Sequence, residues 1–122
     1  VLGSRGLGDV YKRQILATVS ARMTDKAKTL SDEEIRAVWS KAYEGQDFMV
    51  LLPEGTLPAT GNIIGSNAAH LQVVTDRKAG RIYAFAAIDN LNRGTAGQAV
   101  QSLNIALGLP EDAGLTKIGV AP

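Results

Sequence analysis

The sequence has 122 residues, of which 45% are hydrophobic and 20% are charged, with a formal net charge of +1. This length suits one domain with its own core, but it is small for a complete enzyme. The chain contains no cysteine and one histidine, which excludes disulfides, a cysteine nucleophile and a multi-histidine metal site within these residues and suits a cytoplasmic setting. No apolar run is long enough to span a bilayer.

The first fourteen residues are interpreted separately from the rest. The stretch SRGLGDVYKRQ, residues 4–14, is reproduced codon for codon by the end of a transposase-type sequencing adapter. We therefore expect residues 1–14 to be translated adapter and not native protein, with a genuine basic arm as the alternative. Without Arg5, Asp9, Lys12 and Arg13 the net charge becomes −1. The positive charge of the whole chain is then no evidence for a nucleic-acid partner.

The first native elements are a predicted strand and a predicted helix. Residues 15–21, ILATVSA, alternate apolar side chains with small or polar ones, which is typical of a strand. Residues 31–45 predict a helix, because Ser31 and Glu34 form a capping box and the first turn is acidic. Gly45 ends this helix. Its apolar stripe, which we expect to be buried, consists of Ile35, Val38, Trp39, Ala42 and Tyr43.

Three further strands are predicted after this helix. Residues 47–52 form a short apolar run stopped by Pro53, and residues 70–74 and 81–88 form two longer ones joined by a turn. His70 lies with Gln72 on the polar side, where a lone histidine is more often structural than catalytic. With the last helix, the order β-α-β-loop-β-β-α predicts an α+β fold with helices against a sheet.

The last predicted helix lacks charge, because no charged residue occurs between Arg93 and Glu111. Gly108 and Pro110 end it. Its apolar stripe consists of Ala96, Ala99, Val100, Leu103, Ala106 and Leu107, and its other face of Gln98, Gln101, Ser102 and Ile105. A solvated helix face normally carries charges, so we expect protein to cover both sides of this helix, the second side by a partner outside the chain.

The turn before this helix could bind an anion. Gly94, Thr95 and Gly97 are expected near a helix N-terminus, where free backbone N–H groups and the helix dipole favour negative charge. Arg93 is at the unfavourable end of a helix for a cation, and a negative group beside it would explain its position. On these residues alone, a plain turn with a solvated arginine is the favoured interpretation, because the glycine pattern is short.

Several stretches together resemble one known family. They are ILATVSARMT (15–24), AYEGQDFMVLLPEGTLP (42–58), GSN (65–67) and AIDNLNRGTAGQAVQSLNIALGLPEDAGL (87–115). These stretches are similar to the C-terminal part of the N-acetyl-gamma-glutamyl-phosphate reductase family, which consists of NADP-dependent enzymes of arginine biosynthesis. The resemblance covers residues 15–122 in order. The stretch from residue 89 to residue 115 is more specific than a generic glycine pattern.

The resemblance implies a fold and a set of partners. Residues 15–122 would be a fragment of the C-terminal catalytic and dimerisation domain of the glyceraldehyde-3-phosphate and semialdehyde dehydrogenase type, an incomplete α+β domain whose mixed sheet has helices on one face. Its last helix would return to pack on a Rossmann domain that is missing here. The family further implies a homo-oligomer and a small-molecule acyl phosphate as substrate, with no nucleic acid or membrane as partner.

The resemblance also implies a reaction and site residues. The family reduces N-acetylglutamyl 5-phosphate to N-acetylglutamate 5-semialdehyde with release of phosphate, using a catalytic Cys and His that this chain lacks. His70 does not match that histidine, and no metal is implied. Gln98, Asn90 and Gly94 match positions near the NADP nicotinamide. The position of Arg93 at the helix start, and not the resemblance, leads us to expect that it faces the anionic substrate or phosphate.

Two alternatives stay open at this point. One is the related lysine-pathway reductase that acts on an aminoadipyl phosphate, and the other is a non-catalytic dimerisation module. We also expect the isolated chain to aggregate or to form oligomers, because the face from Gln98 to Ile105 would lack its partner domain.

Overall fold

The computed structural model describes residues 14–120, so the predicted adapter segment, Gln14 apart, lies outside the described residues. Its strands are β1 (Gln14–Arg22), β2 (Met49–Leu51), β3 (Ala69–Asp76) and β4 (Arg81–Asp89). Its α-helices are α1 (Asp25–Thr29), α2 (Asp32–Ala42) and α3 (Gly97–Ala106), and two short turns of other helix types are η1 (3-10, Thr60–Ile63) and η2 (π, Asn92–Ala96). The sequence predicted all four strands, α2 and α3, but not α1, η1 or η2.

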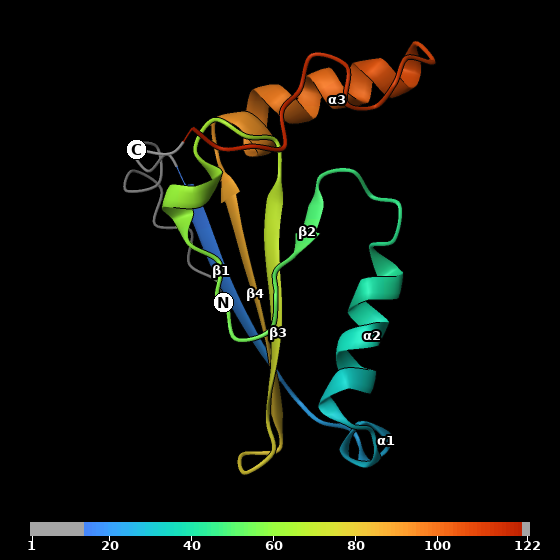
Figure 1. Cartoon of the computed structure of the whole chain (residues 1–122), viewed down its shortest axis with the longest axis vertical. Helices are drawn as coiled ribbons and strands as arrows, with labels where there is room; N and C mark the ends of the chain where they lie inside the picture. The colour runs from blue at the N-terminus through green and yellow to red at the C-terminus, as the bar shows by residue number, and fades with distance from the viewer. Residues whose placement is uncertain (1–13, 121–122) are drawn as a thin grey trace, which may run out of the picture.

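The four strands form one mixed sheet in the order β1-β4-β3-β2 (Figure 1). β2 pairs parallel to β3, and the other two pairs are antiparallel. β1 pairs with β4 along its whole length, from Gln14 opposite Asp89 to Arg22 opposite Arg81. The mixed sheet with its accompanying helices confirms the predicted α+β fold class.

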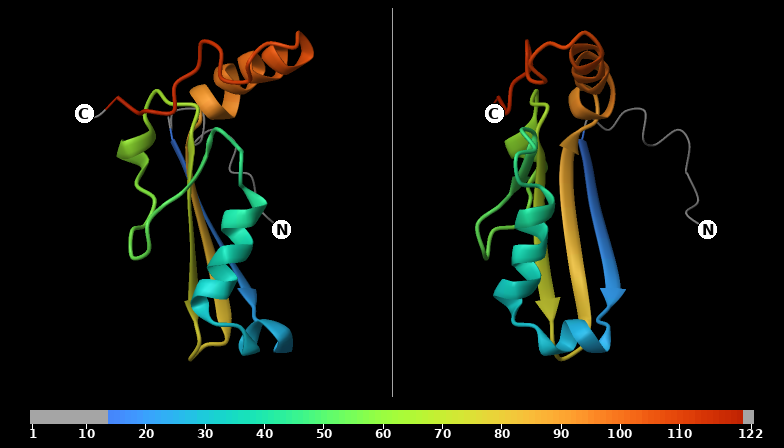
Figure 2. Two further views of the ribbon diagram at one scale, coloured as in Figure 1. Left: turned by 45° about the vertical axis from the view of Figure 1, so that its right-hand side comes forward. Right: turned by 90° about the vertical axis from the view of Figure 1, so that its right-hand side faces the viewer.

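The helices are distributed over the side and the two ends of the sheet. Figure 2 shows α2 in front of β3, whereas β4 and β1 stay uncovered on that side. α1 lies at the end of the sheet that holds the turn between β3 and β4, and α3 crosses the opposite end (Figures 1 and 2). None of the helices within residues 14–120 is long and apolar enough to cross a membrane.

The apolar core lies between α2 and the sheet. Met23, Ile35 and Val73 are its buried centre, and Trp39 packs against them, as predicted for a core aromatic. The capping box of α2 is present, since the Ser31 hydroxyl accepts the Glu34 N–H at 3.1 Å and the Glu34 carboxylate accepts the Ser31 N–H at 2.7 Å. These two bonds satisfy N–H groups that have no partner inside the helix.

The predicted apolar stripe of α2 is only partly correct. Ile35 is buried, and Trp39 and Tyr43 are half-buried with their rings 6.1 Å apart. Val38, however, is 62% exposed, and Ala42 is exposed as well. The physical reason is that α2 covers β3 alone, so a narrower stripe than the sequence pattern suggested meets protein within this chain.

Within residues 14–120, β1 is little covered on either face. Its residues 15–22 are all exposed, including the large apolar side chains of Ile15, Leu16 and Val19. β4 therefore supplies the hydrogen-bond partners for the backbone of β1, whereas the side chains of β1 make few further contacts. An apolar strand of this kind marks a surface that protein covers in a larger assembly.

Candidate functional site

The candidate site lies at the end of β4. There η2 and α3 follow each other as one helical segment, residues 92–106, which we call the rod. Six polar residues hold the sheet and the rod together there, and we call them the joint: Asn67, Asp89, Asn92, Arg93, Gln101 and Asn104. Asn67, Asp89 and Asn104 are buried, and the other three are half-buried. All six residues belong to two of the four stretches that carry the family resemblance, residues 65–67 and residues 87–115.

Asp89 closes the start of the rod. Its buried carboxylate accepts backbone hydrogen bonds from Gly65 at 2.7 Å, Leu91 at 2.8 Å and Asn92 at 3.2 Å. A carboxylate at this place satisfies N–H groups that a helix leaves free and complements its dipole. The negative group at the helix start is thus part of the chain.

The expected anion site on Gly94, Thr95 and Gly97 needs correction for this reason. The rod starts earlier than predicted, with a π turn in which Ala96 donates its N–H to the Leu91 carbonyl at 3.2 Å. Gly97 donates its N–H to the Asn92 carbonyl. Gly97 consequently lies inside a continuous helical rod, whereas Gly94 lies within the π turn that begins it. A π turn is rare and frequently occurs at functional sites.

Gly97 lets the rod approach the sheet closely. It is buried, and a Cβ atom added there would collide with the side-chain oxygens of Asn92 and Asn67. Both amides are fixed, since Asn92 donates to the Gly65 carbonyl at 2.7 Å and Asn67 donates to Gln101 at 3.0 Å. A larger residue at position 97 would have to break one of these contacts.

The direction in which α3 presents its side chains contradicts the sequence prediction. Gly97 and Asn104 are buried and Gln101 is half-buried, so the polar side of the helix faces the chain. The predicted apolar stripe faces outward, with Leu103 56% and Leu107 64% exposed. Gln98 and Ile105 are also exposed. The stripe was correctly recognised, but its burial within this chain was wrong, because the joint holds the helix by hydrogen bonds.

Arg93 is folded inward under the rod. Its guanidinium donates to the Gln101 side-chain oxygen at 2.6 Å and to the Asn67 carbonyl at 3.5 Å, and it lies 5.8 Å from the centre of the Phe48 ring. Gln101 in turn donates to the Glu111 carboxylate at 2.5 Å. Within residues 14–120 Arg93 forms no ion pair, so a half-buried cation is held in place without a carboxylate of its own.

The other three predicted site residues follow one side of the rod. The side-chain oxygen of Asn90 lies against Gly94, 2.7 Å from where a Cβ would be, and the Asn90 carbonyl accepts the Thr95 hydroxyl at 2.7 Å. Gln98 is one helical turn beyond Gly94. Gly94 and Gln98 are exposed, and Asn90 is half-buried. The structure thus places Asn90, Gly94 and Gln98 together, with Arg93 on the inward side next to them.

His70 lies apart from these residues on β3. Its Nδ1 atom is buried and has no hydrogen-bond partner among residues 14–120, and burial lowers the pKa of the imidazole below its usual 6.5. A partly buried, uncharged histidine agrees with the structural interpretation made from the sequence. Among the described residues, no group of three His, Cys, Asp or Glu side chains is placed to hold a metal ion.

Of the joint, sequence reasoning proposed Arg93 as a site residue and missed the other five: Asn67, Asp89, Asn92, Gln101 and Asn104. Asn104 donates to the carbonyls of Glu111 at 3.2 Å and Ala113 at 2.9 Å, which folds the segment after α3 back onto the helix. One signal was available in the sequence. Gly97, Gln101 and Asn104 are spaced by four and three residues, the spacing of one helix face, and that face is small and polar.

Comparisons with known proteins identify the family of this chain. The family of the semialdehyde dehydrogenase dimerisation domain matches residues 9–90. N-acetyl-gamma-glutamyl-phosphate reductase of Bifidobacterium longum (strain DJO10A) is 99% identical over 110 residues, which are 90% of this chain and 30% of the relative.

More distant relatives of the same name extend this result. The one from Bifidobacterium animalis subsp. lactis is 62% identical and the one from Mycobacterium avium 56%, over the same shares of each chain. The chain thus spans about 30% of the length of the curated relatives it matches. On the match of residues 9–90, the chain belongs to the semialdehyde dehydrogenase dimerisation domain family.

Proposed function

We propose that this chain is the C-terminal part of an NADP-dependent reductase that converts N-acetylglutamyl 5-phosphate to N-acetylglutamate 5-semialdehyde and phosphate in arginine biosynthesis. The observation that carries the proposal is the 99% identity to N-acetyl-gamma-glutamyl-phosphate reductase over 110 residues. The chain has no cysteine, so the nucleophile of such an enzyme must come from residues outside it. By itself the chain supplies one wall of the site.

A missing Rossmann domain is the proposed cover of α3. The exposed apolar side chains Val100, Leu103 and Leu107 occupy one side of the rod, and no charge interrupts the sequence from residue 94 to residue 110. Burying this side against another domain would remove a continuous apolar surface from water. This is the arrangement expected if the helix returns from the second domain to the nucleotide-binding one.

NADP would supply the hydride, and the chain's own residues fit one edge of such a site. The Gln98 amide is exposed and makes no hydrogen bond with another described residue, so it is free to bind a ligand. Gly94 is exposed and has no side chain, which permits a ligand to approach its backbone closely. The Asn90 side chain lies against Gly94. We propose these three residues as the cofactor wall.

Arg93 is proposed to attract the anionic substrate and the released phosphate. Gln101 fixes the guanidinium by accepting its hydrogen bond at 2.6 Å, and the Phe48 ring lies beside it at 5.8 Å. A cation without a carboxylate partner is available for phosphate oxygens, which a guanidinium binds in a bidentate way. In this proposal Gln101 is a positioning residue.

The uncovered sheet is the proposed subunit contact of a cytoplasmic homo-oligomer. The matching family is described as a dimerisation domain. Ile15 and Val19, which are exposed and point to the same face of β1, supply an apolar surface that a second copy could cover. An enzyme of amino-acid biosynthesis would be expected to work in the cytoplasm.

The experiment is to express the full-length gene that contains this segment and to assay NADPH oxidation with N-acetylglutamyl 5-phosphate. The proposal expects turnover with this substrate and little with a carrier-linked aminoadipyl phosphate. Turnover only with the aminoadipyl substrate would assign the chain to the lysine-pathway reductase. A native open reading frame that starts near codon 15 and has no activity would make it a dimerisation module.

Two variants of that enzyme separate the proposed roles. Arg93→Ala should raise the KM for the acyl phosphate roughly tenfold to a hundredfold, because a hydrogen-bonded charge pair with the phosphate is lost. Its KM for NADPH should stay unchanged. Gln98→Ala should do the reverse and serves as the matched control. Unchanged KM values for cofactor, acyl phosphate and phosphate in Arg93→Ala would refute the role of Arg93.

A further inference from the structure

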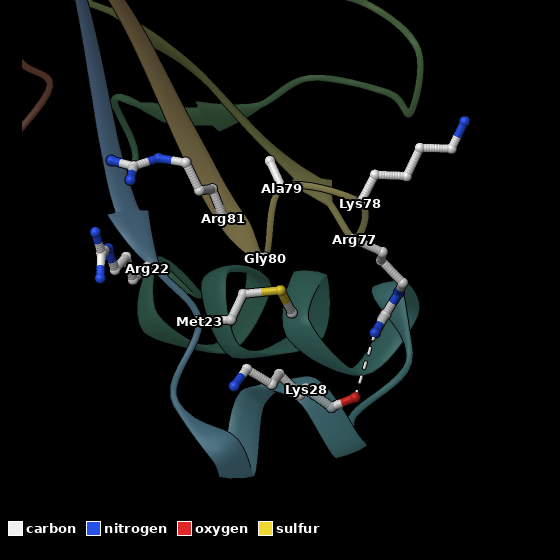
Figure 3. Close-up of a pocket in the computed structure, with 8 residues that line it drawn as sticks. All are labelled: Arg22, Met23, Lys28, Arg77, Lys78, Ala79, Gly80 and Arg81. Carbon is white, nitrogen blue, oxygen red and sulfur yellow. Dashed lines mark hydrogen bonds between the residues drawn. The ribbon is translucent and has the colours of Figure 1, made fainter.

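We propose that the end of the sheet opposite the joint binds a small, multiply charged oxyanion of the phosphate-ester or pyrophosphate class. A hollow of about 700 Å³ lies there between the end of β1, α1 and the turn from β3 to β4. Five of its lining residues are cations, and none is a carboxylate: Arg22, Lys28, Arg77, Lys78 and Arg81 (Figure 3).

Two of these cations are neutralised and shape the wall of the hollow. Lys28 donates to Asp25 at 2.8 Å. Arg77 pairs with Asp32 at 2.5 Å and donates to the Leu30 carbonyl at 2.7 Å, which fastens the turn between β3 and β4 to the segment between α1 and α2. These contacts shape the wall of the hollow, and the other three cations that line it form no ion pair within residues 14–120.

Arg22 and Arg81 are the centre of the proposed site. They lie directly opposite each other on β1 and β4, and Figure 3 shows their guanidinium groups on the same side of the hollow. Like charges directly opposite each other in a sheet are destabilising. Within residues 14–120 neither forms an ion pair, and Arg81 donates to the Ser20 hydroxyl at 2.7 Å.

One acidic residue lies beside this pair of arginines on the next strand of the sheet, but it does not relieve the repulsion between them. Asp76 is opposite Arg81 on β3, but its carboxylate accepts the Ala79 N–H at 2.9 Å and forms no ion pair with Arg81. Two adjacent guanidinium groups match the geometry of a phosphate group, which accepts bidentate hydrogen bonds from each. A bound anion would turn an unfavourable pair into a favourable one.

The lining also limits the kind of ligand. The volume is within the range of small-molecule sites, so it admits a phosphorylated metabolite as well as a bare ion. No aromatic ring lines the hollow on which a nucleobase could stack. Arg81 begins β4 and Arg93 follows its end, so the two lie about 25 Å apart along a nine-residue strand. The proposed site is therefore independent of the proposed reaction site.

The test uses the full-length Bifidobacterium longum relative, titrated with inorganic pyrophosphate by calorimetry at constant ionic strength. We expect saturable binding, weakened at least roughly tenfold by the double variant R22Q/R81Q through loss of two charge pairs. K41Q, which removes an exposed cation on α2, should retain this binding. Equal affinity in R22Q/R81Q and the wild type, or no saturable binding at all, would overturn the proposal.

Thermal unfolding of the same variants distinguishes anion binding from a purely structural role of the two arginines. Without pyrophosphate, R22Q/R81Q should unfold at a temperature equal to or above that of the wild type, because a repulsive pair is gone. With pyrophosphate the order should reverse, since the wild type alone gains stability from the ligand. A wild type that is the more stable protein in both conditions would contradict the proposal.

Discussion

The two longest helices of this chain are attached to the sheet in opposite ways. α2 has a capping box, acidic residues in its first turn and a buried Ile35 that packs on the core. α3 has no charged residue, turns its Gln101 and Asn104 toward the chain and leaves its apolar side exposed. The difference indicates that α2 packs its Ile35 side within these residues, whereas the exposed apolar side of α3 is the surface that we propose another protein layer covers.

The largest effect that tests this difference is expected when apolar side chains of α2 are shortened. Ile35→Ala should destabilise the chain by about 3 kcal/mol, because it leaves a cavity among Met23, Val73 and Trp39. Val38→Ala should change stability by less than about 0.5 kcal/mol, since that side chain is largely exposed. Urea unfolding followed by the fluorescence of Trp39 measures both. Equal losses would mean that α2 buries the wider stripe predicted from its sequence.

A glycine substitution tests the attachment of α3. Gly97→Ala should cost about 1–3 kcal/mol, because the new methyl group meets the fixed amides of Asn67 and Asn92. Gly61→Ala is the matched control, with open space around the site and no left-handed backbone. Amide hydrogen exchange in α3 is the measurement. Protection of α3 that is unchanged by Gly97→Ala would show that the joint does not depend on close approach.

The smallest expected effect concerns His70. Its folded-state pKa is lowered, so below pH 6.5 the unfolded chain binds more protons than the folded one. The stability from the neutral imidazole is therefore complete above that pH and is lost as the pH falls. Asp32, whose pKa is lowered by hydrogen bonds from Thr75 and then Arg77, affects stability only in a more acidic range. His70→Gln should flatten the stability profile between about pH 5 and 7. A profile identical to that of the wild type would contradict this.

The local signals in the sequence were sufficient for much of the fold. The capping box at Ser31, the left-handed Gly45 and Gly108 after the two helices, and the alternation along β1 each act over a few residues, and each prediction is confirmed. The mixed α+β class followed from the order of these elements.

The direction of α3 could not be obtained in the same way. Periodicity identifies the apolar stripe of a helix, but it does not show which side of the helix packs against protein. In α3 the apolar stripe stays exposed within residues 14–120. Polar contacts decided the orientation: Gln101 meets Asn67 and Arg93 from distant parts of the chain. The Asp89 carboxylate likewise accepts the N–H of Gly65, which is distant in the sequence, and the helix begins earlier in the sequence than predicted. The roles of Gln98, Asn90, Gly94 and Arg93 stay predictions.

The central claim is that the apolar side of α3 is a contact surface for another domain. Leu103→Gln, made both in this 122-residue chain and in the full-length relative, tests it most directly. In the isolated chain the substitution should leave the unfolding temperature unchanged and raise the monomer fraction, because a solvated apolar side chain is removed. In the full-length protein it should destabilise by about 2 kcal/mol through lost burial. An equally small effect in both proteins would contradict the claim.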